Sequence, residues 1–267
     1  MGAELEGKFS GLILDMDGVL YRGNEALPGA RELVPALRAA GLSFILLTNN
    51  STLSPEEYST KLARMEIRVD PAAIFTSGLA TSLYLMQHYP TGGGVYVLGE
   101  AALLSLLVRA PGFRPEGWKP DVVVVGLDFK LTYDSLQRAC SAIRAGAAFI
   151  ATNADPTLPV EGGELWPGAG SIVAAVRTCS GVEPVVIGKP NPYIGEMALL
   201  KLDLPAAEVL CVGDRLETDI LLGKGIGTPT ALLLTGASTL VETERSEVKP
   251  DYIYENLPAL MAALGIK

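Results

Sequence analysis

The chain has 267 residues, enough for one large domain or for a core domain with a second domain inserted into it. Hydrophobic residues make up 49% of the chain and charged residues 19%, a balance that excludes a disordered protein. The formal net charge of −9 disfavours binding to nucleic acid polymers and anionic membranes, whereas a metal ion and a lysine can still create a local site for a small phosphorylated molecule.

The sequence lacks the features of a membrane or secreted protein. No segment has the roughly 18 consecutive apolar residues that a membrane helix needs, and residues 1–10 lack the apolar run of a signal peptide. We therefore expect a cytoplasmic protein. Three widely spaced cysteines without a C-x-x-C pair predict reduced thiols. The single histidine, His88, excludes multi-histidine metal sites and H-E-x-x-H zinc peptidases.

Short apolar runs alternate with helical patterns along the chain. The runs predicted as strands are 11–14, 43–47, 74–76, 95–98, 121–125, 148–151, 185–187, 208–212 and 230–234. A capping box at Ser54, followed by Pro55, predicts that a helix begins there. Apolar residues spaced as on one helix face predict another helix over 132–144. We expect Pro35 to start or kink the first helix.

This alternation of strands and helices predicts an α/β fold with a mainly parallel, Rossmann-like sheet. Several strands are hydrophobic throughout, as strands buried on both faces must be. The middle of the chain has a strand and helix pattern of its own and is long enough to bury its own core. We therefore predict a core domain formed by residues 1–79 and 181–267, with an inserted α/β domain at 80–180.

Polar side chains follow several strands of the predicted core at the point where each strand ends. They are Asp15 with Asp17, Thr48 with Asn49, Lys189, and Asp214 with Asp219. Because ligands of open parallel sheets bind beyond the carboxyl ends of the strands, we expect these side chains to converge. Alternating acids also begin calcium-binding loops, but those loops have glycine at the sixth position, whereas Gly18 is the fourth residue counting from Asp15.

Converging carboxylates predict a metal site, because they repel one another unless a cation lies between them. Mg²⁺ is the usual cation beside phosphate substrates. Lys189 and Thr48 suit an anion bound next to that ion. A metal, an anion site and a carboxylate nucleophile together indicate phosphoryl transfer through an aspartyl-phosphate. Asp15 would attack phosphorus, and Asp17 would protonate the leaving oxygen and then activate water.

Four segments of the chain resemble the motifs of haloacid dehalogenase (HAD) superfamily phosphatases. In order, they are DMDGVL (15–20), LLTNNS (46–51), IGKPNP (187–192) and VGDRLETDI (212–220). The chain is most similar to the NagD-like or 4-nitrophenylphosphatase-like branch, which inserts a large α/β cap between the second and third motifs. The segment 151–171 also resembles the cap-to-core segment of that branch, so the resemblance covers essentially the whole chain.

This resemblance implies roles for individual residues. Asp15 would be the nucleophile and Asp17 the general acid and base, with the Asp17 backbone carbonyl as a ligand of Mg²⁺. Asp214 would be a further metal ligand, and Asp219 would orient metal-bound water or Lys189. The phosphate contacts would be Thr48, Asn49 and Lys189.

The substrate itself is left open. Any small phosphomonoester presents the same group to Asp15, and the inserted domain must contact the remainder of the molecule. From position alone, the candidate contacts lie in the loop 153–166, above all Asn153, Asp155 and Trp166, although Asp155 would also suit a helix cap. A phosphomutase or phosphotransferase with the same intermediate is an alternative. A receiver domain is disfavoured because such domains have roughly half this length. The exposed face of the cap could pair two chains into a homodimer.

Overall fold

The structure is a computed structural model that describes residues 4–160 and 164–266. Its contacts divide the chain into two compact units. The first unit comprises Met1–Thr48, Pro55–Phe75 and Lys189–Lys267, and the second comprises Asn49–Ser54 and Thr76–Gly188. The boundaries lie at 75/76 and 188/189 rather than at the expected 79/80 and 180/181. The second unit also includes 49–54, which the sequence analysis assigned to the core.

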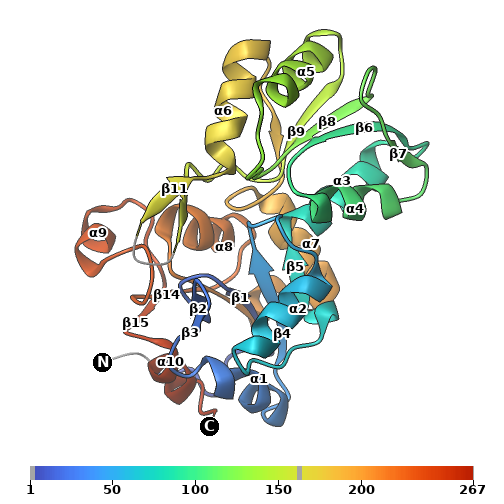
Figure 1. Cartoon of the computed structure of the whole chain (residues 1–267). Coiled ribbons are helices and arrows are strands. Elements are labelled where there is room, and N and C mark those ends of the chain that lie inside the picture. Colours follow the sequence, from blue (N-terminus) through green and yellow to red (C-terminus); the bar gives the residue numbers. More distant parts are fainter. Residues whose placement is uncertain (1–3, 161–163, 267) are drawn as a thin grey trace. The chain divides into compact units, whose positions relative to one another are not determined.

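A six-stranded sheet forms the centre of the first unit (Figure 1). In spatial order its strands are β15 (Tyr252–Tyr254), β14 (Thr230–Leu233), β13 (Val209–Gly213), β1 (Gly11–Asp15), β4 (Ser43–Thr48) and β5 (Ile74–Thr76). The strands from β15 to β4 are parallel to their neighbours. Every residue of β1 and β13 is buried, which agrees with the apolar runs that make up both strands up to Asp15 at the end of β1. The short strand β15 is absent from the sequence prediction.

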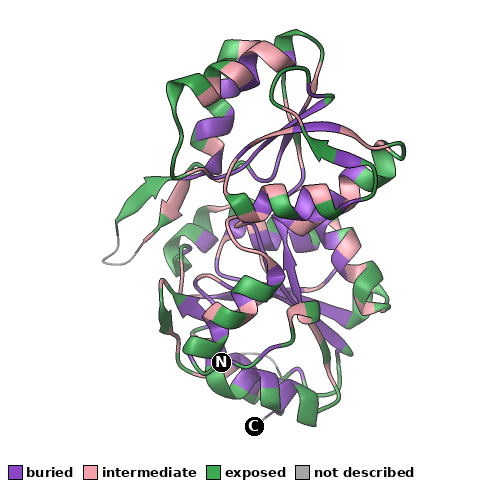
Figure 2. Cartoon of the chain, turned by 45° about the vertical axis from the view of Figure 1, so that its right-hand side comes forward, coloured by how far each residue is buried: buried purple, intermediate pink, exposed green. Residues whose placement is uncertain are grey.

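Helices surround this sheet and place their apolar faces inward, as the burial pattern in Figure 2 shows. They are α1 (Ala30–Ala39), α2 (Pro55–Arg64), α7 (Pro192–Leu202), α8 (Leu221–Gly225), α9 (Leu240–Arg245) and α10 (Leu257–Ala263). A π-helical turn, η4 (Leu216–Ile220), precedes α8, and a small hairpin, β2 (Tyr21–Arg22) with β3 (Glu25–Ala26), follows β1.

Two sequence predictions about helix starts have different outcomes. Helix α2 begins at Pro55 as predicted. Helix α1, by contrast, begins at Ala30, after Gly29 with a φ of 84°, so Pro35 does not start this helix, and a kink at Pro35 stays a prediction. Pro35 is exposed inside the helix, where it lacks the N–H that would bond to the carbonyl of Arg31. The buried Leu33 and Leu37 on the other face hold the helix in place.

The second unit has a parallel sheet of its own with five strands. Their spatial order is β12 (Val185–Val186), β9 (Ala148–Ala151), β8 (Val122–Val125), β6 (Gly93–Leu98) and β7 (Phe113–Pro115). Its helices are α3 (Ser77–His88), α4 (Ala101–Arg109), α5 (Tyr133–Arg144) and α6 (Ala169–Ser180). An antiparallel hairpin, β10 (Thr157–Pro159) with β11 (Leu165–Pro167), precedes α6.

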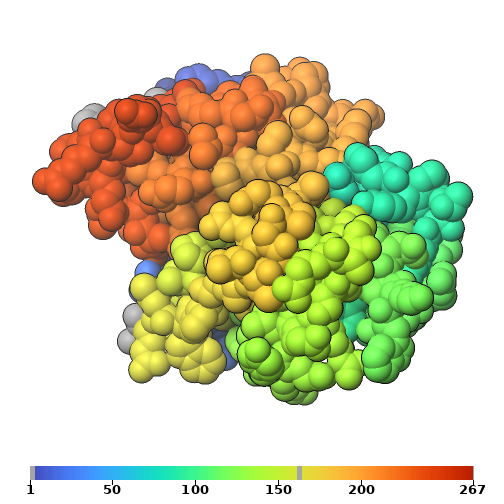
Figure 3. Space-filling view, turned by 90° about the horizontal axis from the view of Figure 1, so that it is seen from above, coloured from blue at the N-terminus to red at the C-terminus, as the bar shows by residue number. Residues whose placement is uncertain are grey.

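Helices α5 and α6 pack against each other and lie side by side on the face seen in Figure 3. Thr132 caps α5 through a capping box with Ser135, and the predicted apolar face of this helix is buried. Cys140 lies in that face, against Val176 of α6. The three cysteines are free, and no helix in the described residues is long and apolar enough to cross a membrane.

Candidate active site

Two neighbouring strands bring acidic residues to one edge of the first sheet. Strand β1 ends at Asp15, and Asp214 follows the end of β13. Because the strands are parallel and Leu14 pairs with Val212, both acids leave the sheet at the same edge, with Asp214 one residue beyond the level of Asp15. Asp219 joins them from η4. The three side chains are buried and place one carboxylate oxygen each within 4.8 Å of the others.

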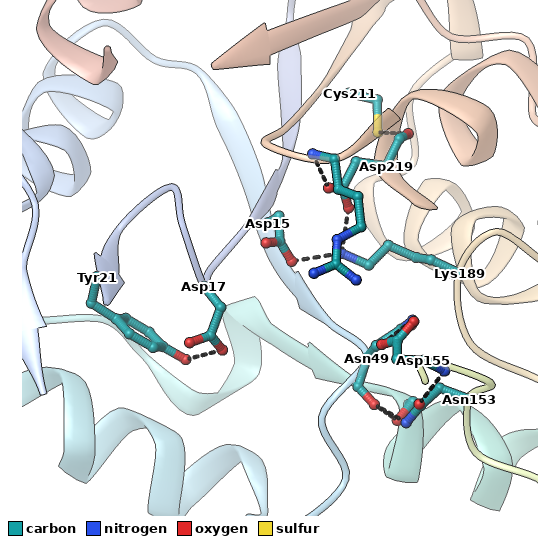
Figure 4. A network of polar contacts seen from close by, with 11 residues as sticks. Asp15, Asp17, Tyr21, Asn49, Asn153, Asp155, Lys189, Cys211 and Asp219 are labelled. Atoms are coloured by element: carbon teal, nitrogen blue, oxygen red, sulfur yellow. Dashed lines mark hydrogen bonds and ion pairs between the residues drawn. The ribbon is translucent and has the colours of Figure 1, made fainter. Parts of the chain in front are cut away.

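Lys189 is the cation of this acidic group. Its ammonium nitrogen donates to Oδ1 of Asp15 at 2.5 Å and to Oδ1 of Asp219 at 2.6 Å (Figure 4). The lysine is 5% exposed, so bulk water screens both ion pairs only weakly. The π-helical turn orients Asp219 further, since the backbone N–H of Arg215 donates to its second oxygen at 3.1 Å.

The electrostatics of the group follow from three buried carboxylates facing one ammonium. Burial raises the pKa of Asp15 well above its ordinary value, and the charges of Asp219 and Asp214 add to this effect, while Lys189 opposes it. Burial, together with the nearby charge of Asp219, raises the pKa of Asp214 to about 6. Burial alone would lower the pKa of Lys189, but the two carboxylates that it contacts outweigh this effect and raise it.

The residues of this group fit a divalent cation. With every acid ionised, the three carboxylates and Lys189 leave two negative charges unmatched, which is the charge that one Mg²⁺ ion balances. Glycines leave room for the Asp214 carboxylate: a Cβ at Gly236 would lie 1.7 Å from its Oδ2 atom, and one at Gly18 would lie 2.4 Å away. The backbone N–H of Ala237 also donates to that oxygen at 2.7 Å.

Asp17 lies outside the acidic group, and its side chain points toward Tyr21 (Figure 4). The hydroxyl of Tyr21 donates to Oδ2 of Asp17 at 3.0 Å. Burial raises the pKa of Asp17, although the charge of Lys61 opposes the rise. Tyr21 was not among the predicted site residues, because a tyrosine after an apolar pair is more typical of a strand than of a catalytic site. The carboxylate that groups with Asp15 and Asp214 is that of Asp219.

Thr48 is buried at the end of β4, the strand on the other side of β1. Leu47 pairs with Asp15, so Thr48 leaves the sheet one residue beyond the level of that aspartate. The sequence analysis expected this strand end to contribute to the site, and its position in the sheet is compatible with that expectation.

The remaining candidates, Asn49, Asn153 and Asp155, form a hydrogen-bonded cluster within the second unit. The amide of Asn49 donates to both carboxylate oxygens of Asp155, at 3.2 and 3.0 Å. The amide of Asn153 donates to the backbone carbonyl of Asn49 at 2.8 Å, which also accepts from the hydroxyl of Ser77. The backbone N–H of Asp155 in turn donates to Asn153. The side chain of Asn49 therefore holds Asp155.

This cluster lines a small pocket of the second unit. The residues around it are Asn49, Asn50, Leu127, Asn153, Asp155, Thr157, Leu158, Gly168 and Ala169. Trp166 does not line the pocket; its indole N–H donates to Glu164 at the surface. Residues 161–163 of the predicted loop lie outside the described part of the chain. The pocket combines amide and carboxylate groups with apolar side chains, a mixture typical of small-molecule sites.

Comparisons of the sequence with known proteins identify the family of this chain. The family model described as haloacid dehalogenase-like hydrolase matches residues 12–113, and a second family model, described as HAD-hydrolase-like, matches residues 186–260. An acid sugar phosphatase from Staphylococcus aureus is 38% identical over 257 residues, which cover 96% of this chain and 98% of that protein. The chain belongs to the haloacid dehalogenase-like hydrolase family. The predicted resemblance is thus confirmed, and the chain is a HAD-type phosphatase.

Solved structures of HAD phosphatases share its fold. The 4-nitrophenylphosphatase from Thermotoga maritima has a TM-score of 0.91 and 37% identity, covering 96% of this chain and 98% of that one. NagD from Escherichia coli has a TM-score of 0.87 and 33% identity, covering 97% and 99%. A glycerol phosphate phosphatase from Mycobacterium tuberculosis, in complex with magnesium, has a TM-score of 0.89 and 33% identity, covering 97% and 78%. The predicted α/β fold class is confirmed.

Proposed function

We propose that this HAD phosphatase is magnesium-dependent and hydrolyses a small phosphomonoester through an aspartyl-phosphate on Asp15. The observation that carries the proposal is the buried group at the strand ends, in which three carboxylates face one lysine. A single structural ion pair would not need the two additional acids, whereas a site for a cation beside a phosphoryl group uses all of them.

The side chains of Asp15 and Asp214 and the backbone carbonyl of Asp17 would hold the magnesium ion. When bound, the ion would supply positive charge that stabilises the phosphoryl oxygens. The room that Gly18 and Gly236 leave for the carboxylate supports Asp214 as a ligand, and the related glycerol phosphate phosphatase, solved in complex with magnesium, supports magnesium as the ion. Lys189 and Thr48 would contact the phosphoryl oxygens from the ends of their own segments.

Lys189 also prepares Asp15 for attack. It binds Oδ1 of Asp15, which leaves Oδ2 as the nucleophile. In the first step the bond from Oδ2 to phosphorus forms, the bond from phosphorus to the leaving oxygen breaks, and Asp17 gives its proton to that oxygen. In the second step Asp17 takes a proton from water as the water oxygen attacks phosphorus. The bond from phosphorus to Oδ2 of Asp15 breaks, phosphate leaves, and both aspartates return to their starting states.

The part of the substrate beyond the phosphate would contact the second unit, in the role of a cap. Asn153 and Asp155 are the proposed contacts, because both line the pocket of that unit and have polar groups fixed by neighbours. The names of the related enzymes refer to sugar phosphate, glycerol phosphate and 4-nitrophenyl phosphate as substrates. We extend this range of small phosphomonoesters to the present chain, with a cytoplasmic location and a homodimer as further proposals.

A panel of phosphomonoesters assayed for phosphate release tests the proposed function. We expect release with Mg²⁺, no release with a chelator, and loss of turnover in Asp15→Asn while the fold is kept. Asp203→Asn is the matched control, because Asp203 is exposed at the end of α7 in a left-handed conformation that asparagine adopts readily. Persistent turnover in Asp15→Asn would refute the assignment of the nucleophile.

The same assay separates hydrolysis from phosphoryl transfer to an alcohol. A phosphotransferase or phosphomutase would use the same aspartyl-phosphate but pass the phosphoryl group to a hydroxyl of a second molecule. We expect free phosphate to account for the substrate consumed when an alcohol or sugar acceptor is added. Formation of a new phosphomonoester in place of free phosphate would favour the alternative.

A further inference from the structure

The turn after β1 places the hydroxyl of a buried tyrosine next to the carboxylate of Asp17. Tyr21 is fully buried, and its hydroxyl donates to Oδ2 of Asp17 at 3.0 Å. The turn is tight: the N–H of Gly18 donates to the carbonyl of Tyr21 at 2.8 Å, and Tyr21 pairs with Ala26 in the β2–β3 hairpin. The backbone of Tyr21 is therefore held at two points, and its side chain reaches back over the turn to Asp17.

The ring of Tyr21 is also held from one face. The ammonium nitrogen of Lys61, on α2, lies 4.2 Å from the centre of the ring, a distance at which a cation is attracted to the face of an aromatic ring. Burial raises the pKa of the Tyr21 hydroxyl well above its ordinary value, with Asp17 adding to the rise. The hydroxyl therefore keeps its proton and remains a hydrogen-bond donor throughout the physiological pH range.

We propose that Tyr21 is a positioning residue for acid–base catalysis: its hydroxyl binds Oδ2 of Asp17 and thereby leaves Oδ1 as the oxygen that carries the transferred proton. The inference rests on the proposed role of Asp17. A carboxylic acid has one protonated oxygen, and its unprotonated carbonyl oxygen is the stronger acceptor, so a hydrogen bond from Tyr21 to Oδ2 favours the proton on Oδ1. The contact from Tyr21 thus decides which oxygen faces the leaving group and restricts rotation of the side chain.

The proton balance of both steps is compatible with this role. When the bond from phosphorus to the leaving oxygen breaks, the proton moves from Oδ1 of Asp17 to that oxygen, and Asp17 becomes a carboxylate that still accepts from Tyr21. When water attacks the aspartyl-phosphate, Oδ1 takes the proton of water and the acid form returns. Tyr21 gains and loses no proton, which distinguishes it from a catalytic residue.

Dependence on the leaving group tests the inference. Phosphate esters of aliphatic alcohols need an acid to protonate the departing oxygen, whereas 4-nitrophenolate departs with little help. We expect Tyr21→Phe, which keeps the buried ring, to lower kcat/KM, which reports the step in which the leaving group departs, for an alkyl phosphate by about tenfold to hundredfold, the size expected when a hydrogen bond to a charged group is lost. For 4-nitrophenyl phosphate the loss should be less than about threefold. Tyr254→Phe, at a buried tyrosine of β15, is the matched control.

A double-mutant cycle with Asp17→Asn separates this inference from the proposed function. Asp17→Asn should itself lower kcat/KM selectively for the alkyl phosphate, and adding Tyr21→Phe should then change the ratio of kcat/KM between the two substrates no further. If Asp17→Asn has no such selectivity, the acid role of Asp17 fails. If Asp17→Asn is selective but Tyr21→Phe slows both substrates equally, or neither, the role of Tyr21 fails.

A second variant covers the case in which Tyr21→Phe does not fold, which thermal unfolding will reveal. Lys61→Met removes the cation above the ring and keeps the tyrosine hydroxyl. With the ring less firmly held, we expect a severalfold loss of kcat/KM for the alkyl phosphate and a smaller loss for 4-nitrophenyl phosphate. Equal losses for the two substrates would overturn the inference in this variant as well.

Discussion

Lys189 shows what one buried side chain contributes to charge balance. It binds Asp15 and Asp219 where the lysine and both acids are almost fully buried. A second lysine, Lys224, makes an ion pair of similar length with Asp251, but there both side chains are about two-fifths exposed. Water screens the exposed pair and leaves the buried one unscreened. Removing the lysine should therefore lower the free energy of unfolding more at the buried pair than at the exposed pair.

Lys189→Met should lower the free energy of unfolding by about 3–5 kcal/mol at neutral pH, because it leaves two buried carboxylates facing each other. It should also abolish phosphatase activity. Lys224→Met is the matched control and should cost less than about 1 kcal/mol. Urea unfolding in the presence of a chelator measures both values. Equal losses in the two variants would contradict the idea that burial determines the effect.

At the level of elements, the segments that follow β13 shape the surroundings of Asp214. The turn at η4 orients Asp219 through the N–H of Arg215, and the loop after β14 brings Gly236 and Ala237 against the carboxylate of Asp214. A π-helical turn and a glycine loop thus shape the acidic group through their backbones. The turn orients Asp219, and the glycine leaves room for the buried carboxylate of Asp214.

Gly236→Ala should weaken magnesium binding by at least about tenfold, because the new Cβ would overlap the Asp214 carboxylate and displace it. The concentration of Mg²⁺ that gives half-maximal phosphate release measures this effect. Gly225→Ala is the control, since nothing lies within 4 Å of a Cβ at that helical position. If both variants needed the same magnesium concentration, the space at Gly236 would have no bearing on the metal.

Position along the strands could be predicted from the sequence, but contacts between distant loops could not. Asp15 and Asp214 follow apolar runs, and the order of parallel strands places such residues at one edge. Asn49 also follows a predicted strand, yet its amide binds Asp155, 106 residues away, and no local pattern indicates that pairing. The role of Tyr21 could not be predicted either, because its apolar neighbours and its own ring are equally typical of a core residue.

At the scale of the whole molecule, stability should depend on pH and magnesium together. In the metal-free protein the pKa of Asp214 is raised to about 6, and the pKa of Asp15 is raised as well. Between about pH 4 and pH 6 the folded state therefore holds protons that the unfolded state has lost. The free energy of unfolding should consequently fall as the pH rises through this window, and the raised pKa of Asp15 acts in the same direction.

Magnesium should raise the melting temperature more at pH 7.5 than at pH 5, because protons compete with the ion for the same carboxylates. Differential scanning calorimetry at the two pH values, with Mg²⁺ or with a chelator, measures the difference. Asp214→Asn should remove most of the stabilisation by magnesium at pH 7.5. An equal increase in melting temperature at both pH values would count against a metal bound by these acids.

The division of the chain into two units has a consequence for protein engineering. The second unit consists of the long insertion Thr76–Gly188 and the six residues Asn49–Ser54, which lie between two segments of the first unit. A chimaera that exchanges only the long insertion with a relative would leave the native Asn49 opposite a foreign residue at position 155. Designers who wish to change substrate preference by exchanging this unit should therefore transplant both segments. The residues at positions 49 and 155 then come from the same protein.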